Sequence, residues 1–191
     1  FNELLFNPFP GEPDYIEFYN RSGKVADASS LILFSVNDET ADTSSASNLS
    51  EIPRCIIPGC CYAITTDRKS VIDRYPSALP LCLFEVSHLP SMPDDRGHLI
   101  LLNRKLEKID EVVYEEDMHY SLRGGSEGIS LEKVREEGSS SDRSLWHSAS
   151  EAAGWGTPGA PNSVLVEAAV AGDAVSLSTE RITPDNDGID D

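Results

Sequence analysis

Proline- and glycine-rich turns divide this chain into apolar runs that are too short to be core helices. The first break, at residues 7–13, places three prolines within seven residues, and the interior of a helix does not tolerate proline. Short runs rich in aromatic and β-branched residues between such turns are typical of strands. This punctuation therefore predicts an all-β chain.

The strand pattern recurs along most of the sequence. Strands are expected at residues 1–6, 15–20, 30–36, 55–57, 60–66, 81–86, 98–103, 108–114 and 128–134. Residues 55–66, around Pro58-Gly59, have the pattern of a hairpin. One short helix is expected at residues 67–75, where Val71, Ile72 and Tyr75 have helical spacing and Pro76 ends the pattern. This order of elements predicts an antiparallel β-sandwich with one short helix.

Alternation within these runs also predicts the core and the extent of the domain. The expected core includes Ile16, Phe18, Ile64, Leu99, Leu101 and Val113. Glu17 interrupts the apolar run between two of them. We expect one domain at residues 1–163, and then a linker with the truncated start of a second domain at residues 164–191. Because the strand pattern begins at Phe1 rather than after a Met, we expect the chain to be part of a longer protein.

The charge balance excludes several classes of partner. The formal net charge is −18, which repels nucleic acid and anionic membrane surfaces, since both bind proteins through cationic side chains. The longest aliphatic run is Leu99–Leu102, far short of the roughly 18 apolar residues of a membrane span. We therefore expect no nucleic-acid binding and no membrane insertion of this segment.

The four cysteines are Cys55, Cys60, Cys61 and Cys82, with no C-x-x-C spacing. The favoured interpretation is free thiols that pack as small apolar side chains. The alternative is a structural disulfide between Cys55 and Cys60, which flank the Pro58-Gly59 turn. A catalytic thiol is disfavoured, because no histidine is placed in the sequence to activate it.

Two groups of residues resemble metal ligands. Asp117, His119 and His147 are the most ligand-like polar cluster, although their spacing matches no established metal motif. The favoured interpretation is that both histidines form hydrogen bonds with the backbone of loops. At the C-terminus, Asp185, Asp187 and Asp190 alternate around Gly188, as calcium-binding loops do. Calcium at this acidic turn is the one cofactor that the sequence suggests.

Several ordered motifs together resemble a known family. They begin with Asn2-Glu3-Leu4-Leu5-Phe6 and Asp14-Tyr15-Ile16-Glu17-Phe18-Tyr19-Asn20, and they end with Gly156-Thr157-Pro158-Gly159-Ala160-Pro161-Asn162. Over residues 1–163 they resemble the bacterial, Bacteroidetes-type lamin-tail domain. Residues 183–191 resemble the start of the immunoglobulin-like module that ends secreted surface proteins of that group.

The resemblance implies an immunoglobulin-like sandwich on an extracellular or cell-surface, outer-membrane-associated protein. It implies a non-catalytic spacer, adhesion or interaction module whose partners are other domains of the polypeptide, a surface protein or a glycan. It carries over no catalytic residue.

Two alternatives to this function stay open. The first is a glycan- or ligand-binding module that uses exposed aromatic side chains, with Tyr114, Tyr120, Trp146 and Trp155 as candidates. The second is a metal-dependent hydrolase that uses Asp117, His119 and His147.

Overall fold

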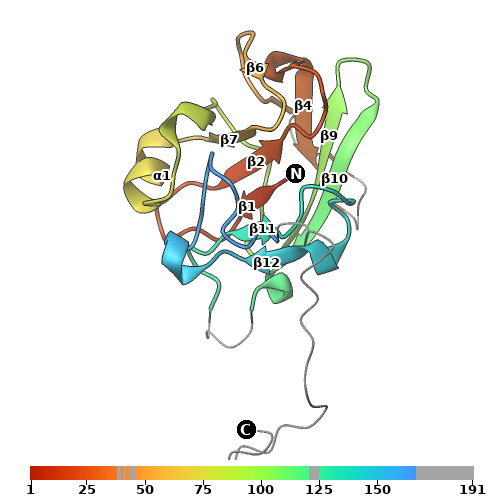
Figure 1. The fold of residues 1–191 in the computed structure, drawn as a ribbon. Helices are drawn as coiled ribbons and strands as arrows, with labels where there is room; N and C mark the ends of the chain where they lie inside the picture. The colour runs from red at the N-terminus through yellow and green to blue at the C-terminus, as the bar shows by residue number, and fades with distance from the viewer. Residues whose placement is uncertain (38–39, 41, 44–45, 121–124, 167–191) are drawn as a thin grey trace, which may run out of the picture.

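A computed structural model describes residues 1–166 except 38–39, 41, 44–45 and 121–124. Two sheets make up most of it (Figure 1). In spatial order, the six-stranded sheet contains β12 (Trp146–Ser148), β11 (Leu131–Lys133), β1 (Glu3–Leu5), β2 (Tyr15–Tyr19), β7 (Cys61–Thr65) and β8 (Leu83–Glu85). The four-stranded sheet contains β10 (Lys108–Glu115), β9 (Arg96–Asn103), β4 (Leu31–Ser35) and β5 (Ser47–Asn48). The first strand of the chain thus lies in the middle of the larger sheet.

Smaller elements complete the fold. β3 (Ala26–Asp27) pairs with β6 (Cys55–Ile56). Among the described residues, α1 (Arg68–Arg74) is the one α-helix; the Asp67 side chain accepts a hydrogen bond from the Ser70 N–H and caps it. Short 3-10 turns occur at Ala28–Ser30, Pro80–Cys82, Glu116–Met118, Arg143–Leu145 and Glu151–Ala153. No helix in the described part of the chain is long and apolar enough to cross a membrane.

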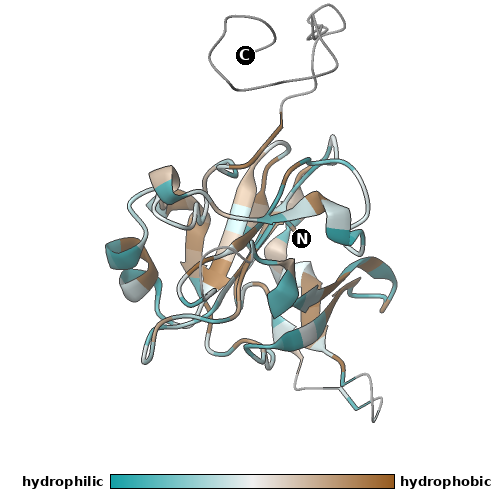
Figure 2. Ribbon diagram, turned by 90° about the horizontal axis from the view of Figure 1, so that it is seen from below, coloured by the Kyte–Doolittle hydropathy of each residue, from teal (hydrophilic) through white to brown (hydrophobic). Residues whose placement is uncertain are grey.

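The main core lies between the two sheets. The six-stranded sheet contributes one face, including Leu4, Ile16 and Ile64, and the four-stranded sheet contributes Leu99 and Val112; all five are fully buried. Figure 2 shows the hydrophobic strands inside the molecule and hydrophilic turns around them. This arrangement confirms the predicted all-β, immunoglobulin-like sandwich with one short α-helix.

A second, smaller core covers the opposite face of the six-stranded sheet. There α1 packs Val71 against Leu5, Tyr15 and Leu83, and Tyr75 closes the cluster. The register places Leu5 opposite Tyr15 and Glu3 opposite Glu17, so this face also carries acidic residues toward its centre. A loop near the end of the described chain covers these acidic residues.

The structure corrects three sequence predictions. Residues 55–66 do not form a hairpin: β6 pairs with β3, and β7 lies between β2 and β8 in another sheet. The Asn20 N–H donates to the Cys60 carbonyl, so the chain leaves the turn alongside β2. Val112 is fully buried and its neighbour Val113 only half-buried. The β7–β8 pair is parallel, while the other strand pairs of the described residues are antiparallel.

Candidate functional site

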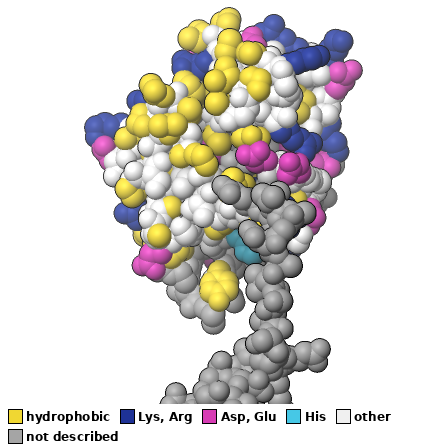
Figure 3. All heavy atoms as spheres, in the orientation of Figure 1, with side chains coloured by type: hydrophobic (Ala, Val, Ile, Leu, Met, Phe, Trp, Pro, Cys, Tyr) yellow, Lys and Arg dark blue, Asp and Glu magenta, His cyan; other side chains and the backbone are white. Residues whose placement is uncertain are grey.

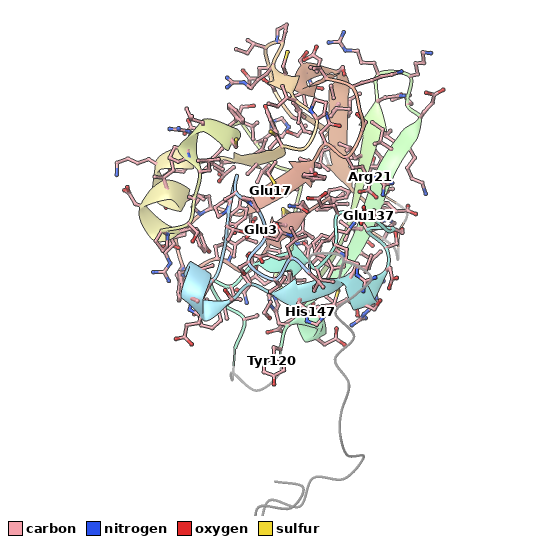
Figure 4. All side chains as sticks on the ribbon, viewed as in Figure 1. Glu3, Glu17, Arg21, Tyr120, Glu137 and His147 are labelled. Carbon is pink, nitrogen blue, oxygen red and sulfur yellow. The ribbon has the colours of Figure 1, made fainter. Side chains whose placement is uncertain are left out.

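The polar residues proposed as metal ligands have different surroundings in the structure. Asp117 is exposed and forms an ion pair with Arg143, at 2.6 Å. His147 is exposed on β12 (Figure 4). His119 packs its ring against Phe6, with 5.4 Å between ring centroids. In the described part of the chain, no three His, Cys, Asp or Glu side chains are placed to hold a metal ion together.

His119 is held in the fold rather than presented to solvent. Its Nδ1 lies 3.0 Å from the Ser148 hydroxyl oxygen. Burial lowers the pKa of His119 to about 4, because desolvation disfavours the imidazolium. The ring is therefore neutral at physiological pH. The proposed calcium ligands Asp185, Asp187 and Asp190 lie outside the described residues, and that site stays a prediction.

All four cysteines are free in the structure, including Cys55 and Cys60, the pair for which a disulfide was the alternative. Cys55 is exposed on β6. Cys60, Cys61 and Cys82 line one cavity of about 230 Å³. Burial and the neighbouring Glu17 carboxylate raise the pKa of the Cys61 thiol, which keeps it protonated and a poor nucleophile.

The most unusual polar feature of the molecule is a set of three buried glutamates, which we call the carboxylate cluster: Glu3, Glu17 and Glu132. All three are completely buried. They occupy one row across the adjacent strands β11, β1 and β2, because Glu3 is opposite both Glu132 and Glu17 in the strand register. Figure 4 shows Glu3 and Glu17 in the middle of the molecule. An isolated charge in such a place is strongly disfavoured, so the hydrogen-bond partners decide what the cluster does.

The loop that follows Trp155 supplies many of these partners; we call residues 156–164 the closing segment. The Thr157 N–H donates to Glu3 Oε1 at 2.8 Å, and the Gly159 N–H donates to Glu17 Oε2 at 2.5 Å. The Val164 N–H donates to Glu132 Oε2 at 3.1 Å. Each glutamate therefore accepts a backbone hydrogen bond from the same segment. These three bonds hold the closing segment against the central strands of the six-stranded sheet.

Side chains of the closing segment add to this attachment. The hydroxyls of Thr157 and Ser163 each lie 2.8 Å from a Glu132 carboxylate oxygen. The Asn162 amide donates to the backbone carbonyls of Asn2 and Lys133, at 3.0 and 2.8 Å. The segment and the first strand thus hold each other in place.

The hydrogen-bond donors around Glu3 indicate which of its two carboxyl oxygens carries a proton. Its Oε1 lies within hydrogen-bond distance of three donors, the hydroxyls of Tyr15 (2.7 Å) and Ser130 (2.5 Å) and the Thr157 N–H. Its Oε2 has only the Thr157 hydroxyl, at 3.3 Å. That hydroxyl has one hydrogen and lies closer to Glu132, so a proton on Glu3 Oε2 completes the network by donating to Thr157.

Burial and mutual repulsion favour the protonated carboxyls. Desolvation, followed by the charges of Glu17 and Glu132, raises the pKa of Glu3 well above its ordinary value. Desolvation raises the pKa of Glu17 to about 7, although Asn2 and Gly159 donate to it. The pKa of Glu132 is raised for the same reason, against donors from Ser163 and Thr157. The cluster therefore holds at least one proton at neutral pH.

Only one member of this cluster stands out in the sequence. Glu17 does so because it interrupts an apolar strand, whereas Glu3 follows Asn2 and Glu132 precedes Lys133, so neither interrupts a continuous apolar run. The signal that could have joined them is the glycine- and threonine-containing segment at residues 156–159, whose backbone N–H groups suit buried carboxylates. Strand register, which places the three side by side, is not readable from the sequence.

The four aromatic candidates for ligand binding divide into two pairs. Tyr114 and Trp146 belong to the core, where the Trp146 ring N–H donates to the Ser140 carbonyl at 2.8 Å. Tyr120 is 65% exposed and projects from one end of the molecule (Figure 4). Trp155 is half-buried in the wall of a surface pocket. The structure therefore leaves Tyr120 and Trp155 as the candidates.

Comparisons of the chain with protein-family models, with curated proteins and with solved structures found no match.

Proposed function

We propose that residues 1–163 form a non-catalytic interaction module of a larger secreted or cell-surface protein. The observation that carries this proposal is the carboxylate cluster. Its three acidic side chains bind the closing segment from inside the fold, so they hold the module together. Residues with strongly shifted pKa values usually suggest a catalytic site; here burial of the three carboxyls beneath the closing segment accounts for the raised pKa values.

The positions of the two ends support a module that projects from its point of attachment. The side-chain amide of Asn2 donates to Asn162 at 2.7 Å, so the start and the end of the domain are adjacent. Neighbouring ends are common in domains that tolerate insertion into a longer chain. With its ends together, the module presents the rest of its surface to partners instead of separating them as a linear spacer does.

The surface supports partners that are neutral or cationic. The net charge of −18 disfavours polyanions. Apolar side chains are also exposed, including Ile57 at 53% and Leu81 at 84%. Figure 3 shows apolar side chains gathered on the upper part of one face, and contiguous exposed apolar surface is typical of interaction sites. The lamin-tail resemblance supports an extracellular or cell-surface location, with a surface protein, a glycan or neighbouring domains as partners.

Two assays on the full chain test this proposal. First, we expect no turnover of p-nitrophenyl phosphate, butyrate or β-glucoside in the presence of Zn²⁺, Mn²⁺ or Ca²⁺. Turnover that is abolished by His119→Ala would establish the hydrolase alternative instead. Second, a membrane-impermeant amine reagent applied to intact producing cells should label the chain, since the Lys69 side chain is 83% exposed. Labelling only after lysis would contradict a surface location.

A further inference from the structure

A pocket of about 500 Å³ opens on the surface beside α1. Its lining includes Phe9, Arg74, Pro76, Glu127, Gly128 and Trp155. These residues come from the loop before β2, the end of α1 and the loops on either side of β11 and β12, and none belongs to a strand. The volume lies in the range of small-ligand sites.

Trp155 occupies this wall in an unfavourable backbone conformation. Its φ is 71°, in the left-handed region that side chains other than glycine rarely adopt. Hydrogen bonds fix this conformation: the Trp155 N–H donates to the Ser150 carbonyl at 3.1 Å, and its carbonyl accepts from the Ser130 N–H at 3.0 Å. A glycine would satisfy the same bonds without strain. The indole ring lies in the pocket wall rather than in the two hydrophobic cores.

The rest of the pocket is held rigidly. The Arg74 guanidinium lies over the Phe9 ring, 3.9 Å from its centroid, and forms an ion pair with Glu12 at 3.6 Å. Gly128 lies so close to Phe9 that a Cβ there would overlap the ring, at 2.6 Å from Cδ2 and closer still to Cε2. The Tyr75 hydroxyl donates to the Gly128 carbonyl at 3.2 Å. A pocket fixed in this way loses little conformational entropy when a ligand binds.

The chemistry of the lining suits a ligand with an apolar face and a hydroxyl rim. Phe9 and Trp155 supply ring surfaces, Arg74 supplies N–H donors, and the exposed Glu127 carboxylate supplies acceptors. A pyranose ring has this combination of C–H faces and hydroxyls that both donate and accept. Because Glu12 already balances the charge of Arg74, a neutral sugar fits better than an acidic one.

We propose that this pocket, which we call the Trp155 pocket, binds a neutral pyranose unit of a glycan. This proposal rests on the interaction role proposed above and names its ligand class. An extended peptide is a poorer fit, because peptides that add to a sheet need a free strand edge, and no strand of the described residues lines the Trp155 pocket.

Calorimetric titration of the full chain with cellohexaose, mannohexaose and xylohexaose tests the proposal. We expect saturable binding of at least one of them, and tighter binding than with hexagalacturonate. Trp155→Gly removes the ring and fits the backbone without strain, and should weaken binding by about tenfold or more. Leu106→Gly is the matched control, since Leu106 also has a positive φ of 63° but does not line the pocket.

Each contrary outcome contradicts a different part of the proposal: the glycan ligand, the pocket as its binding site, or the class of the sugar. No saturable binding of any neutral hexaose at about 10 mM, weaker than a millimolar Kd, would overturn the glycan ligand. Binding that is unchanged in Trp155→Gly, or weakened equally in Leu106→Gly, would overturn the pocket as the site. Tighter binding of hexagalacturonate than of any neutral hexaose would replace the ligand class. These results leave the surface-labelling and turnover assays unaffected, so the interaction module can be judged separately.

Discussion

Glu3 and Glu17 are neighbours in one buried row, yet their hydrogen bonds differ in kind. One oxygen of Glu3 accepts from three donors, and the other faces only the shared Thr157 hydroxyl. Both oxygens of Glu17 face N–H groups that cannot accept, from Asn2 at 2.7 Å and from Gly159 at 2.5 Å. Glu3 therefore has room for a hydrogen, whereas the two N–H donors at Glu17 match its ionised form, in which both oxygens accept.

This difference predicts opposite responses to glutamine. In Glu3→Gln the amide NH₂ takes the place of the protonated oxygen, so the free energy of unfolding should change by less than about 1 kcal/mol. In Glu17→Gln an NH₂ group meets an N–H donor in the interior, and the loss should be about 2–3 kcal/mol. Urea unfolding measures both: Glu3→Gln at pH 4, below the ordinary glutamate pKa of 4.5, and Glu17→Gln at pH 8, above the Glu17 pKa of about 7. Equal losses in the two variants would show that the proton is not placed on Glu3.

Among the elements, β9 and β10 form the longest pair of strands. At one position of this pair, packing requires a glycine. Gly97 on β9 lies opposite Tyr114 on β10. The Tyr114 ring is fully buried, stacks on Phe6 with 4.3 Å between centroids, and donates its hydroxyl to the Pro93 carbonyl. A Cβ at Gly97 would come within 2.7 Å of the ring carbon Cε1 of Tyr114.

Because Tyr114 is held on several sides, it cannot move away from an added methyl group. Gly97→Ala should therefore destabilise the protein by about 1–3 kcal/mol, the usual range for overpacking. Gly23→Ala is the matched control, since nothing lies within 4 Å of its Cβ position. Thermal unfolding followed by circular dichroism compares the two. A melting temperature for Gly97→Ala equal to that of the control would show that the ring is not fixed.

Local sequence signals predict where a helix, strand or turn occurs better than they predict which strands pair with one another. Asp67 and Pro76 mark the two ends of the helix, which forms over Arg68–Arg74. The Pro58-Gly59 turn is evident in the sequence, but a turn does not say which strand follows it in space, and the expected hairpin was wrong. The adjacent valines Val112 and Val113 are ambiguous for a similar reason, because alternation cannot choose between two apolar neighbours.

For the whole molecule, the same limit explains why the carboxylate cluster was not predicted. Glu132 lies far along the chain from Glu3 and Glu17, and the sheet order and register bring the three into one row. The overall class was predictable because the alternation and turn spacing of many short strands favour a sandwich. The Trp155 pocket depends on three loops meeting beside α1, which no local pattern reports.

The cluster also gives the molecule a pH dependence of defined sign. The pKa of Glu3 is raised in the fold, so the folded state binds more protons than the unfolded state above about pH 4.5. The stability that Glu3 provides is therefore complete below its unfolded pKa, and it is lost as the pH rises through the folded one. Glu17, with a pKa of about 7, contributes in the same direction.

Glu3→Gln isolates this effect, because the groups unrelated to the cluster titrate alike in both proteins. The stability of the variant relative to the unmodified chain should improve as the pH rises from 5 to 8, by up to about 1.4 kcal/mol per pH unit. Urea unfolding across this range measures the difference. A relative stability that stays constant with pH would mean that the Glu3 pKa is not raised.

Carboxyl ¹³C chemical shifts followed by NMR from pH 3 to 9 test most directly whether the acidic residues of the interior hold the fold together. We expect the Glu3 carboxyl to remain protonated at pH 6 and the Glu17 carboxyl to titrate near pH 7. The carboxyl of a glutamate in a model peptide titrates at about 4.3. If Glu3, Glu17 and Glu132 all titrate at that value, the three carboxyls are not buried beneath the closing segment and do not hold the fold together.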